Sequence, residues 1–317
     1  MKLFSSVHDV PDIKALVKEA LHLKQFPYAY KDLGENKTIA LVFLNPSLRT
    51  RMSTQKAALN LGMNVMVLNM DKEGWALELR DGVIMNGTTV EHIREAAAVM
   101  GQYADIIGVR SFPGLKNREE DYGEMIFNKF VQYCGVPVVS LESATRHPLQ
   151  SLADLVTIEE LKTRERPKVV LTWAPHVKPL PQAVPNSFAE WMTKADVEFI
   201  IAHPEGYELS AEFTKGATIT HYQDEALADA DFIYVKNWSA YEPYGKIFQG
   251  NEDWMLTNKK LKNTNKAKVM HCLPVRRNLE LSDEILDGES SIVVHEAGNR
   301  VWAAQAVLKR MLEELVK

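Results

Sequence analysis

The sequence has little that would place the protein in a membrane or outside a reducing compartment. Its 317 residues include two cysteines, Cys134 and Cys272, which lie far apart. No apolar run reaches the ~18 residues that a membrane span needs, and the N-terminus lacks the apolar stretch of a signal peptide. We therefore expect a soluble protein of the cytoplasm.

A surplus of positive charge is also absent. Lys and Arg number 37 against 42 Asp and Glu, which gives a net charge of −5. This balance argues against nucleic acid or an anionic membrane as a partner, but it allows a local basic pocket for a small anion. The length and the hydrophobic content of 46% suit roughly two globular domains.

Several motifs of common enzyme classes are missing. No strand is followed by G-x-G-x-x-G, no segment reads G-x-x-x-x-G-K-[ST], and neither H-E-x-x-H nor clustered Cys and His ligands occur. A dinucleotide-dependent dehydrogenase, a P-loop NTPase and a zinc hydrolase are therefore disfavoured.

Short β-branched runs alternate with helical patterns along the whole chain. Most of these runs are apolar throughout, as expected for strands of parallel sheets that helices cover on both faces. We predict an α/β fold with strands at Thr38–Leu44, Asn64–Leu68, Asp105–Val109, Val136–Leu141, Lys168–Trp173, Val197–Ala202, Phe232–Lys236, Lys268–Cys272 and Ser291–Val294.

Apolar residues at helical spacing predict the segments between the strands. A capping box formed by Thr88 and Glu91 would begin one of these helices. We predict helices over Ile13–Leu21, Met52–Leu61 and Thr89–Tyr103, and from Glu296 to the end of the chain. The domain boundary is placed near Glu142–His147.

The first candidate site is Ser47-Leu48-Arg49-Thr50-Arg51, between a predicted strand and a predicted helix. Free backbone N–H groups, two hydroxyls and two guanidinium groups at this turn would suit a phosphate dianion. The alternative is a well-capped helix with two solvated arginines, and the local pattern does not separate the two.

Two further candidates follow predicted strands. His147-Pro148-Leu149-Gln150 lies at the carboxyl end of a strand, where open parallel sheets bind ligands, although helix capping is the commoner role of His-Pro. His271-Cys272-Leu273-Pro274 ends another strand, and its cysteine can equally be a small buried hydrophobe. Arg110 and Arg300 stand at element ends and are either site cations or surface arginines.

Together these segments resemble the transcarbamylase family, that of aspartate and ornithine transcarbamylases. Ser47–Arg51 looks like the family's S-x-R-T-R carbamoyl phosphate motif, and His147–Gln150 looks like its H-P-x-Q. His271–Pro274 matches the H-C-L-P of the ornithine-type enzymes. With Asn299-Arg300, these landmarks occur in family order over nearly the whole chain.

The resemblance implies two doubly wound parallel-sheet domains. Residues 1–146 would bind carbamoyl phosphate, residues 147–295 would bind the amino acid, and the C-terminal helix, 296–317, would return to the first domain. Family members are homotrimers in which a loop of the neighbouring subunit completes each site. Here that loop would be Asp71–Thr89, with Trp75 as the contributing residue. No metal or organic cofactor is implied.

The family's residue roles can be carried onto matching positions. The phosphate would be bound by Ser47, Leu48, Arg49, Thr50, Trp75 and Arg300, and the carbamoyl group by Thr50, Arg110, His147 and Gln150. The last four residues and Cys272 are the predicted catalytic residues. Placing the substrates in line and donating to the developing oxyanion would account for the catalysis.

One segment departs from the ornithine enzymes. These carry an aspartate for the α-ammonium of ornithine, in D-x-W-x-S-M-G, where this chain has Lys236. A lysine repels an ammonium, so we expect the α-amine of the substrate to be masked as a neutral amide. The ornithine segment is also replaced, by Leu171–Pro179. If Lys236 is instead a solvated strand-end lysine, free ornithine stays possible.

These changes resemble the branch that acts on Nα-acylated ornithine. The resemblance implies an amino-acid site lined by Glu142, His176, Lys236, Cys272, Leu273 and Arg276. Acetyl-type enzymes carry a glutamate near the acyl group where this chain has Val90, unless Val90 is an early helical residue buried behind the cap. Without that charge a succinyl tail is not repelled, and Arg276 or Lys178 could pair with it.

We therefore predict carbamoyl transfer to N2-succinylornithine, a step toward arginine, with N2-acetylornithine and then ornithine as the alternatives. An aspartate transcarbamylase is disfavoured by H-C-L-P. A non-catalytic protein that senses carbamoyl phosphate is the alternative of another class. It would be expected to lose the groups around the carbonyl, and Arg110, His147, Gln150 and Cys272 are all present.

Overall fold

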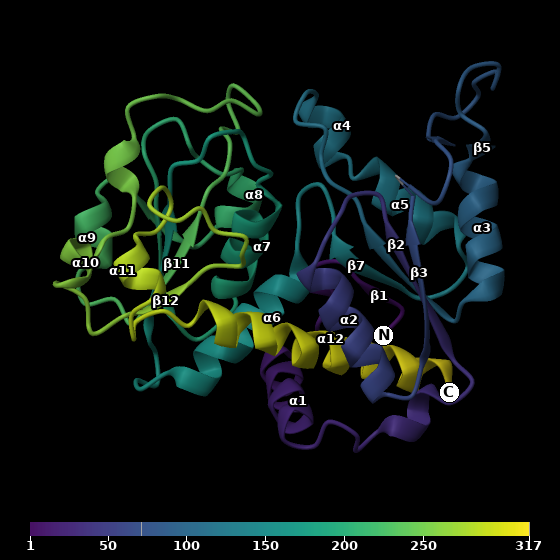
Figure 1. Cartoon of the computed structure of the whole chain (residues 1–317), viewed down its shortest axis with the longest axis horizontal. Helices are drawn as coiled ribbons and strands as arrows, with labels where there is room; N and C mark the ends of the chain where they lie inside the picture. Colours follow the sequence, from purple (N-terminus) through teal and green to yellow (C-terminus); the bar gives the residue numbers. More distant parts are fainter. Residues whose placement is uncertain (71, 317) are drawn as a thin grey trace. The chain divides into compact units, whose positions relative to one another are not determined.

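Two separate parallel sheets organise the chain. The computed structural model describes residues 1–70 and 72–316. Unit 1 comprises Met1–Gly114, Glu119–Leu149 and the chain from Arg300, and unit 2 comprises Leu115–Arg118 and Gln150–Asn299. Each unit has its own five-stranded sheet (Figure 1). The predicted α/β fold with two parallel sheets is therefore confirmed.

The sheet of unit 1 has the strand order β1-β7-β6-β2-β3, and all of its pairings are parallel. The inner strands are buried on both faces, which explains their continuous apolar sequence. The strands span Leu3–Phe4 (β1), Thr38–Phe43 (β2), Asn64–Asn69 (β3), Ile106–Arg110 (β6) and Val138–Glu142 (β7).

Helices cover both faces of this sheet. Ala40, Val42 and Ile107 pack with Phe127 and Phe130 in the core beneath α3 and α5. The helices α1, α2 and the C-terminal part of α12 lie on the other face (Figure 1). The helices of unit 1 are α1 (Ile13–Gln25), α2 (Arg49–Asn60), α3 (Ile93–Tyr103), α5 (Met125–Tyr133) and α12 (Val293–Leu315), which begins in unit 2.

The sheet of unit 2 has the order β10-β9-β8-β11-β12 and is also parallel. Its strands span Lys168–Trp173 (β8), Glu198–Ala202 (β9), Thr218–Thr220 (β10), Phe232–Lys236 (β11) and Lys268–Met270 (β12). Its helices are α6 (Pro148–Leu161), α7 (Ala183–Met192), α8 (Ala211–Thr214), α9 (Gln223–Leu227), α10 (Asn258–Leu261) and α11 (Asp283–Leu286). Large aromatic side chains, among them Phe188 stacked on Tyr234 at 4.2 Å, fill its core.

Smaller elements complete the chain. A two-stranded sheet pairs Leu77–Glu78 (β4) with Glu91–His92 (β5). Short helices occur at Val7–Asp9 (η1), Lys31–Gly34 (η2), Arg118–Tyr122 (α4) and Glu252–Trp254 (η3). No helix among residues 1–70 and 72–316 is long and apolar enough to cross a membrane.

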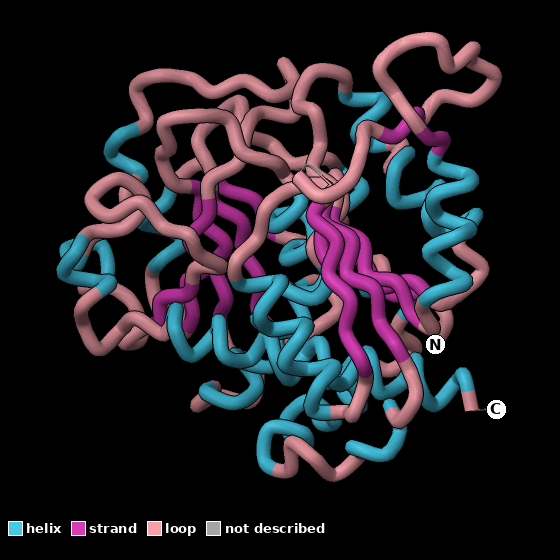
Figure 2. The backbone as a smooth tube through the Cα atoms, turned by 45° about the vertical axis from the view of Figure 1, so that its right-hand side comes forward, coloured by secondary structure: helices cyan, strands magenta, loops and turns pink. Residues whose placement is uncertain are grey.

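Strand order reverses once in each sheet, between β2 and β6 in unit 1 and between β8 and β11 in unit 2. Long loops leave each sheet at one end (Figure 2). Ligands of open parallel sheets bind at the carboxyl ends of the strands beside such a reversal. The topology therefore directs attention to the loops that follow β2, β6, β8 and β11.

Two local predictions are wrong. Ser291–Val294 is not a strand, because Ser291 makes a single bridge to Val269 and α12 begins at Val293. The helix predicted from Thr89 begins at Ile93, with the His92 side chain as its cap. The predicted capping box of Thr88 and Glu91 does not form, because Glu91 lies in β5 and its carboxylate accepts from the Trp75 indole (2.8 Å).

Candidate active site

The turn after β2 leads into α2 with a serine, two arginines and no carboxylate. The Ser47 hydroxyl accepts from the backbone N–H of Thr50 (3.3 Å), in the first turn of α2. The first turn of α2 contains Arg49 and Arg51 and no acidic residue. Cations beside the positive end of a helix dipole are unfavourable until an anion neutralises them, so the charges of this turn suit a negatively charged ligand. Leu48, just before the helix, is exposed.

Two buried arginines of unit 1 meet at Thr50. The Arg300 Nη2 atom donates to the Thr50 hydroxyl (2.5 Å), and the Arg110 Nη1 atom lies 3.4 Å from the same oxygen. Arg110 also forms an ion pair with Glu142, at the end of β7. Burying two guanidinium groups beside one carboxylate costs free energy that a bound anion would offset. We name Thr50, Arg110, Glu142, His147 and Arg300 the arginine cluster.

His147 completes this cluster. Its Nε2 atom lies 3.4 Å from both the Arg300 Nη2 atom and the Glu142 carboxylate. Burial, and then the charges of Arg300, Arg110 and Arg49, hold the pKa of His147 well below its usual range, so the imidazole is neutral at neutral pH. Among the described residues, the buried His147 Nδ1 and Arg110 Nε atoms have no hydrogen-bond partner. Such orphaned groups are typical of a binding site.

Gln150 lies in unit 2, at the start of α6, and its orientation is fixed. Its Nε2 atom donates to Asp154 (2.7 Å) and to Glu296 (3.1 Å). Carboxylates only accept hydrogen bonds when ionised, so the amide nitrogen must face them and Oε1 must face away. This buried Oε1 atom has no partner within the described part of the chain, which leaves it as an acceptor for a ligand N–H.

Glu296 also holds the His271–Pro274 segment. Glu296 accepts from the backbone N–H of His271 (2.8 Å), and the His271 ring accepts from the Leu273 N–H (2.9 Å). The other ring nitrogen of His271 lies 3.4 Å from Glu280. Burial alone would raise the pKa of Glu280, but the hydrogen bond from His271 and the charges of His271 and Lys236 lower it. Cys272, on the same segment, is buried and forms no disulfide.

The predicted amino-acid residues of unit 2 stand at or after the ends of β8, β11 and β12. The Arg276 Nε atom donates to His176 Nε2 (3.1 Å), and His176 Nδ1 contacts the Lys178 carbonyl (2.9 Å). Burial, and to a lesser extent Lys236 and Arg276, lower the pKa of His176. Lys236 itself is buried at the end of β11. The residues that departed from the ornithine pattern therefore lie around one sheet edge.

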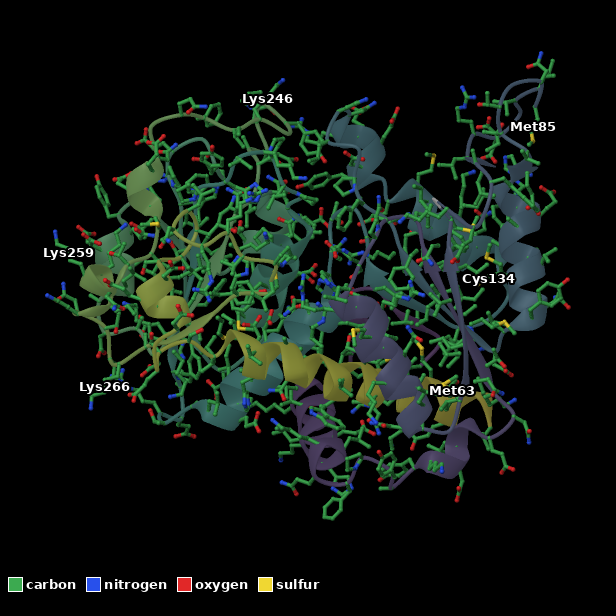
Figure 3. The ribbon with its side chains drawn as sticks, viewed as in Figure 1. Met63, Met85, Cys134, Lys246, Lys259 and Lys266 are labelled. Atoms are coloured by element: carbon green, nitrogen blue, oxygen red, sulfur yellow. The ribbon has the colours of Figure 1, made fainter. Side chains whose placement is uncertain are left out.

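The loop predicted to serve a neighbouring subunit belongs to unit 1. Its first residue, Asp71, lies outside the described residues. Trp75 is 53% exposed and Val90 is 66% exposed, so Val90 is not a helical residue buried behind a cap. Met85 lies on the outer part of the same loop (Figure 3). The roles of Trp75 and Val90 in ligand binding stay predictions.

The structure assembles part of the predicted site directly and adds residues that the sequence did not indicate. Unit 1 brings Thr50, Arg110, His147 and Arg300 together and includes Glu142, which was expected among the amino-acid ligands. Asp154, Glu280 and Glu296 were missed. Asp154 lies four residues after Gln150 on α6, a helical spacing that signals a contact, whereas Glu296 is 146 residues away from Gln150.

The comparisons with known proteins agree with this geometry. Residues 2–160 match the carbamoyl-P binding domain of aspartate/ornithine carbamoyltransferase, and residues 181–311 match its Asp/Orn binding domain. The chain is similar to N-succinylornithine carbamoyltransferase of Bacteroides fragilis (strain 638R), with 55% identity over 317 residues that cover 99% of this chain and 100% of the relative.

More distant relatives extend the similarity. N-acetylornithine carbamoyltransferase of Xylella fastidiosa (strain Temecula1) is 36% identical over 328 residues, which cover 96% of each chain. A solved structure with a TM-score of 0.91 and 32% identity covers 98% of this chain and 100% of its own. It is a variant of N-acetyl-L-ornithine transcarbamylase in which one glutamate is replaced by valine, complexed with carbamyl phosphate and N-succinyl-L-norvaline.

The predicted resemblance and the predicted class of enzyme are thus confirmed. The chain belongs to the aspartate/ornithine carbamoyltransferase family.

Proposed function

We propose that this protein transfers the carbamoyl group of carbamoyl phosphate to the δ-amine of N2-succinyl-L-ornithine, as a step toward arginine. The products are N2-succinyl-L-citrulline and phosphate. The observation that carries the proposal is the convergence of the buried Arg110 and Arg300 side chains on Thr50, at the cationic start of α2. That arrangement suits an acyl phosphate, which carries a phosphate group and a carbonyl group side by side.

The phosphate of the donor binds at the start of α2. The backbone N–H groups of this turn, the hydroxyls of Ser47 and Thr50, and the guanidinium groups of Arg49 and Arg300 supply the donors. We place Leu48 in the same turn as a backbone contact. Trp75 of a neighbouring subunit is proposed to cover the phosphate, which makes the active form a homotrimer.

The carbamoyl group binds beside the phosphate. Arg110, His147 and Thr50 are the groups that donate to its carbonyl oxygen, where negative charge develops during transfer. One donor in such a position typically contributes ~3 kcal/mol to transition-state stabilisation. The fixed Oε1 atom of Gln150 accepts from the carbamoyl N–H₂ group, which sets the plane of the carbonyl for attack.

The chemical step needs no covalent intermediate with the protein. The neutral δ-amine attacks the carbamoyl carbon, a C–N bond forms, and the C–O bond to phosphate breaks with its electron pair staying on the phosphate oxygen. The amine gives up one proton to the departing phosphate. Alignment of the two substrates and a preorganised oxyanion site therefore account for the catalysis. In this scheme the Leu273 carbonyl and Cys272 orient the incoming amine.

The acceptor is recognised by residues that tolerate no free α-ammonium. Lys236, whose charge acts on Glu280 and His176, would repel an ammonium. It can donate hydrogen bonds to the carboxylate and to the amide oxygen of an acylated amino acid. Glu142 and His176 are proposed to contact the amino-acid backbone, and Arg276 to pair with the succinyl carboxylate. Val90 replaces the glutamate that would repel that carboxylate.

Two comparisons support succinyl over acetyl. The relative with 55% identity is named for N-succinylornithine, whereas the acetyl-type relative reaches 36%. The valine variant of the acetyl-type enzyme was solved with N-succinyl-L-norvaline. A cytoplasmic location is part of the proposal and is supported by two cysteines that are free thiols.

A substrate panel tests this function. The purified protein is incubated with carbamoyl phosphate and N2-succinylornithine, N2-acetylornithine, ornithine or aspartate, and ureido product and phosphate are measured together. We expect product with N2-succinylornithine and a much lower kcat/KM with the other three. Equal turnover of free ornithine would refute the role of Lys236. Binding of carbamoyl phosphate without phosphate release in any arm would favour the sensor.

A further inference from the structure

Two histidines of unit 2 lie side by side at the carboxyl ends of neighbouring strands, away from the strand reversal. His203 directly follows β9 and His221 directly follows β10. The strands are paired with Ala202 opposite Thr220, so the two histidines occupy the next matching positions. Their ring centroids are 5.0 Å apart. Nothing in the proposed transfer reaction uses either residue.

The ring orientation of both histidines is that of metal ligands. His203 Nδ1 lies 2.8 Å from the Pro204 carbonyl, and His221 Nδ1 lies 3.0 Å from the His203 carbonyl. A carbonyl only accepts, so each Nδ1 carries the hydrogen and each Nε2 keeps its lone pair. Metal-binding histidines are usually fixed by such a hydrogen bond from the other ring nitrogen.

His203 presents its lone pair from a buried position. The side chain is fully buried, and its Nε2 atom has no hydrogen-bond partner among residues 1–70 and 72–316. A buried nitrogen acceptor without a donor is unfavourable unless a ligand is bound to it. This orphaned atom is independent evidence that something binds at this position.

Glu208 supplies a third donor atom. It lies on the loop after β9, and one of its oxygens accepts from the Gly206 N–H (3.2 Å). The candidate ligand atoms of His203, Glu208 and His221 all lie within 4.8 Å of one another. Donor atoms in a tetrahedral zinc site with bonds of about 2.0–2.1 Å are about 3.3 Å apart, so the exposed Glu208 and His221 need to close by about 1.5 Å at most.

We propose that His203, Glu208 and His221 form a binding site for a divalent transition-metal ion such as zinc. Two imidazoles and one carboxylate form a known zinc ligand set, and they leave a fourth position for water. Imidazole also excludes Mg²⁺ and Ca²⁺ as preferred occupants, because those ions select oxygen ligands. The site does not depend on the proposed carbamoyl transfer.

The metal would fix the loop between β9 and α8. This loop carries Tyr207, whose ring packs on Trp173 at 4.4 Å and whose carbonyl accepts from the Trp238 indole (2.8 Å). Tyr207 also lines a pocket with His176 and Phe248. Linking Glu208 to two strand ends would restrict the motion of the pocket wall. We therefore expect the metal to raise thermal stability.

Zinc binding by the full-length protein tests the site. The protein is freed of metal with a chelator and titrated with zinc in a calorimeter, and cobalt is added in parallel as a spectroscopic probe. We expect one zinc per chain at micromolar affinity, a rise in Tm, and visible ligand-field absorption with cobalt. His221→Ala and Glu208→Gln, both at exposed positions, should each weaken zinc binding by at least about 10-fold.

Matched variants assign the binding to these residues. Glu205→Gln, an exposed neighbour of Glu208, and His8→Ala should bind zinc as the wild type does. Cys272→Ser tests whether zinc binds at this cysteine instead, and it should also leave the affinity for zinc unchanged. The proposal is overturned if the wild type does not bind zinc, if His221→Ala and Glu208→Gln bind it normally, or if Cys272→Ser abolishes binding. Circular dichroism of each metal-free variant checks that the fold is intact.

Discussion

The carboxyl edges of the two sheets differ in their electrostatics. In unit 1, Arg110 and Arg300 gather at Thr50, and Arg110 forms an ion pair with Glu142. In unit 2, carboxylates dominate: Asp154 and Glu296 fix Gln150, and Glu280 lies beside His271. The edge of unit 1 therefore has a surplus of buried positive charge. At the edge of unit 2, the buried carboxylates are hydrogen-bonded to groups of the same unit.

This difference separates two tasks. A cluster of cations that lacks an anion is suited to one constant dianionic ligand, because any other ligand leaves the buried charge uncompensated. A network whose carboxylates are hydrogen-bonded within the unit provides a fixed framework. Side chains that can differ from one substrate specificity to another, such as Lys236, His176 and Arg276, are positioned on it. We infer that unit 1 supplies most of the site for the donor and unit 2 most of the site for the acceptor.

The largest effect is expected from removing a cation of unit 1. Arg110→Met should lower kcat by about 10²–10³, because it removes a donor to the developing oxyanion. It also leaves Glu142 buried without its partner, so Tm should fall. Adding Glu142→Gln should recover Tm but not kcat. Arg277→Met, which removes an exposed arginine paired with Asp283 and Asp287, is the control. Turnover of Arg110→Met near the wild-type rate would contradict the assignment.

The next effect tests the network of unit 2. Glu296→Gln removes the charge that orients the Gln150 amide and accepts from His271 N–H. A hydrogen bond to a charged group is typically worth about 1.5–3 kcal/mol, so we expect kcat to fall by about 10- to 100-fold with little change in KM for carbamoyl phosphate. Glu289→Gln, at an exposed position, should behave as wild type. A change confined to KM for carbamoyl phosphate would disprove the positioning role.

A smaller effect concerns the acyl group. Val90→Glu should lower kcat/KM for N2-succinylornithine by about 10-fold and leave N2-acetylornithine less affected, because the new charge repels the succinyl carboxylate. Val90→Gln keeps the size without the charge and should retain the succinyl preference. If both variants change the two substrates equally, Val90 does not face the acyl group.

The smallest effect is on pH-dependent stability. The folded-state pKa of His147 lies well below its usual range, so below about pH 6.5 the unfolded chain binds a proton that the native state does not. Stability should therefore fall with decreasing pH by up to about 1.4 kcal/mol per pH unit from this residue. The free energy of unfolding, measured with urea at several pH values, should depend less steeply on pH in His147→Asn than in the wild type. Parallel slopes would mean that His147 is not held neutral.

Much of the fold could be predicted because the local sequence determines where the strands and helices form. Apolar runs such as Thr38–Phe43 and Lys168–Trp173 are strands because both of their faces are buried. Ser291–Val294 has the same β-branched composition but begins a helix, since propensity is overridden by tertiary context. The short edge strands β1 and β10 escaped prediction because two or three residues have too little pattern.

Residues of the candidate active site could be predicted only where they belong to a contiguous sequence motif. Ser47–Arg51 and His147–Gln150 are contiguous, so their residues could be named from the sequence. The role of Glu296 depends on a partner that is distant in the chain, because Gln150 lies 146 residues away. No local signal separates such a buried glutamate from one on the surface, because its burial depends on contacts between distant segments.

The division of tasks between the two units is tested most directly by carbamoyl phosphate binding, measured by calorimetry without an acceptor. Arg300→Met should weaken this affinity by about 10- to 100-fold, because it removes a charged donor to the phosphate. Lys236→Met should bind carbamoyl phosphate as the wild type does. An unchanged affinity in Arg300→Met, or a comparable loss in Lys236→Met, would contradict the account.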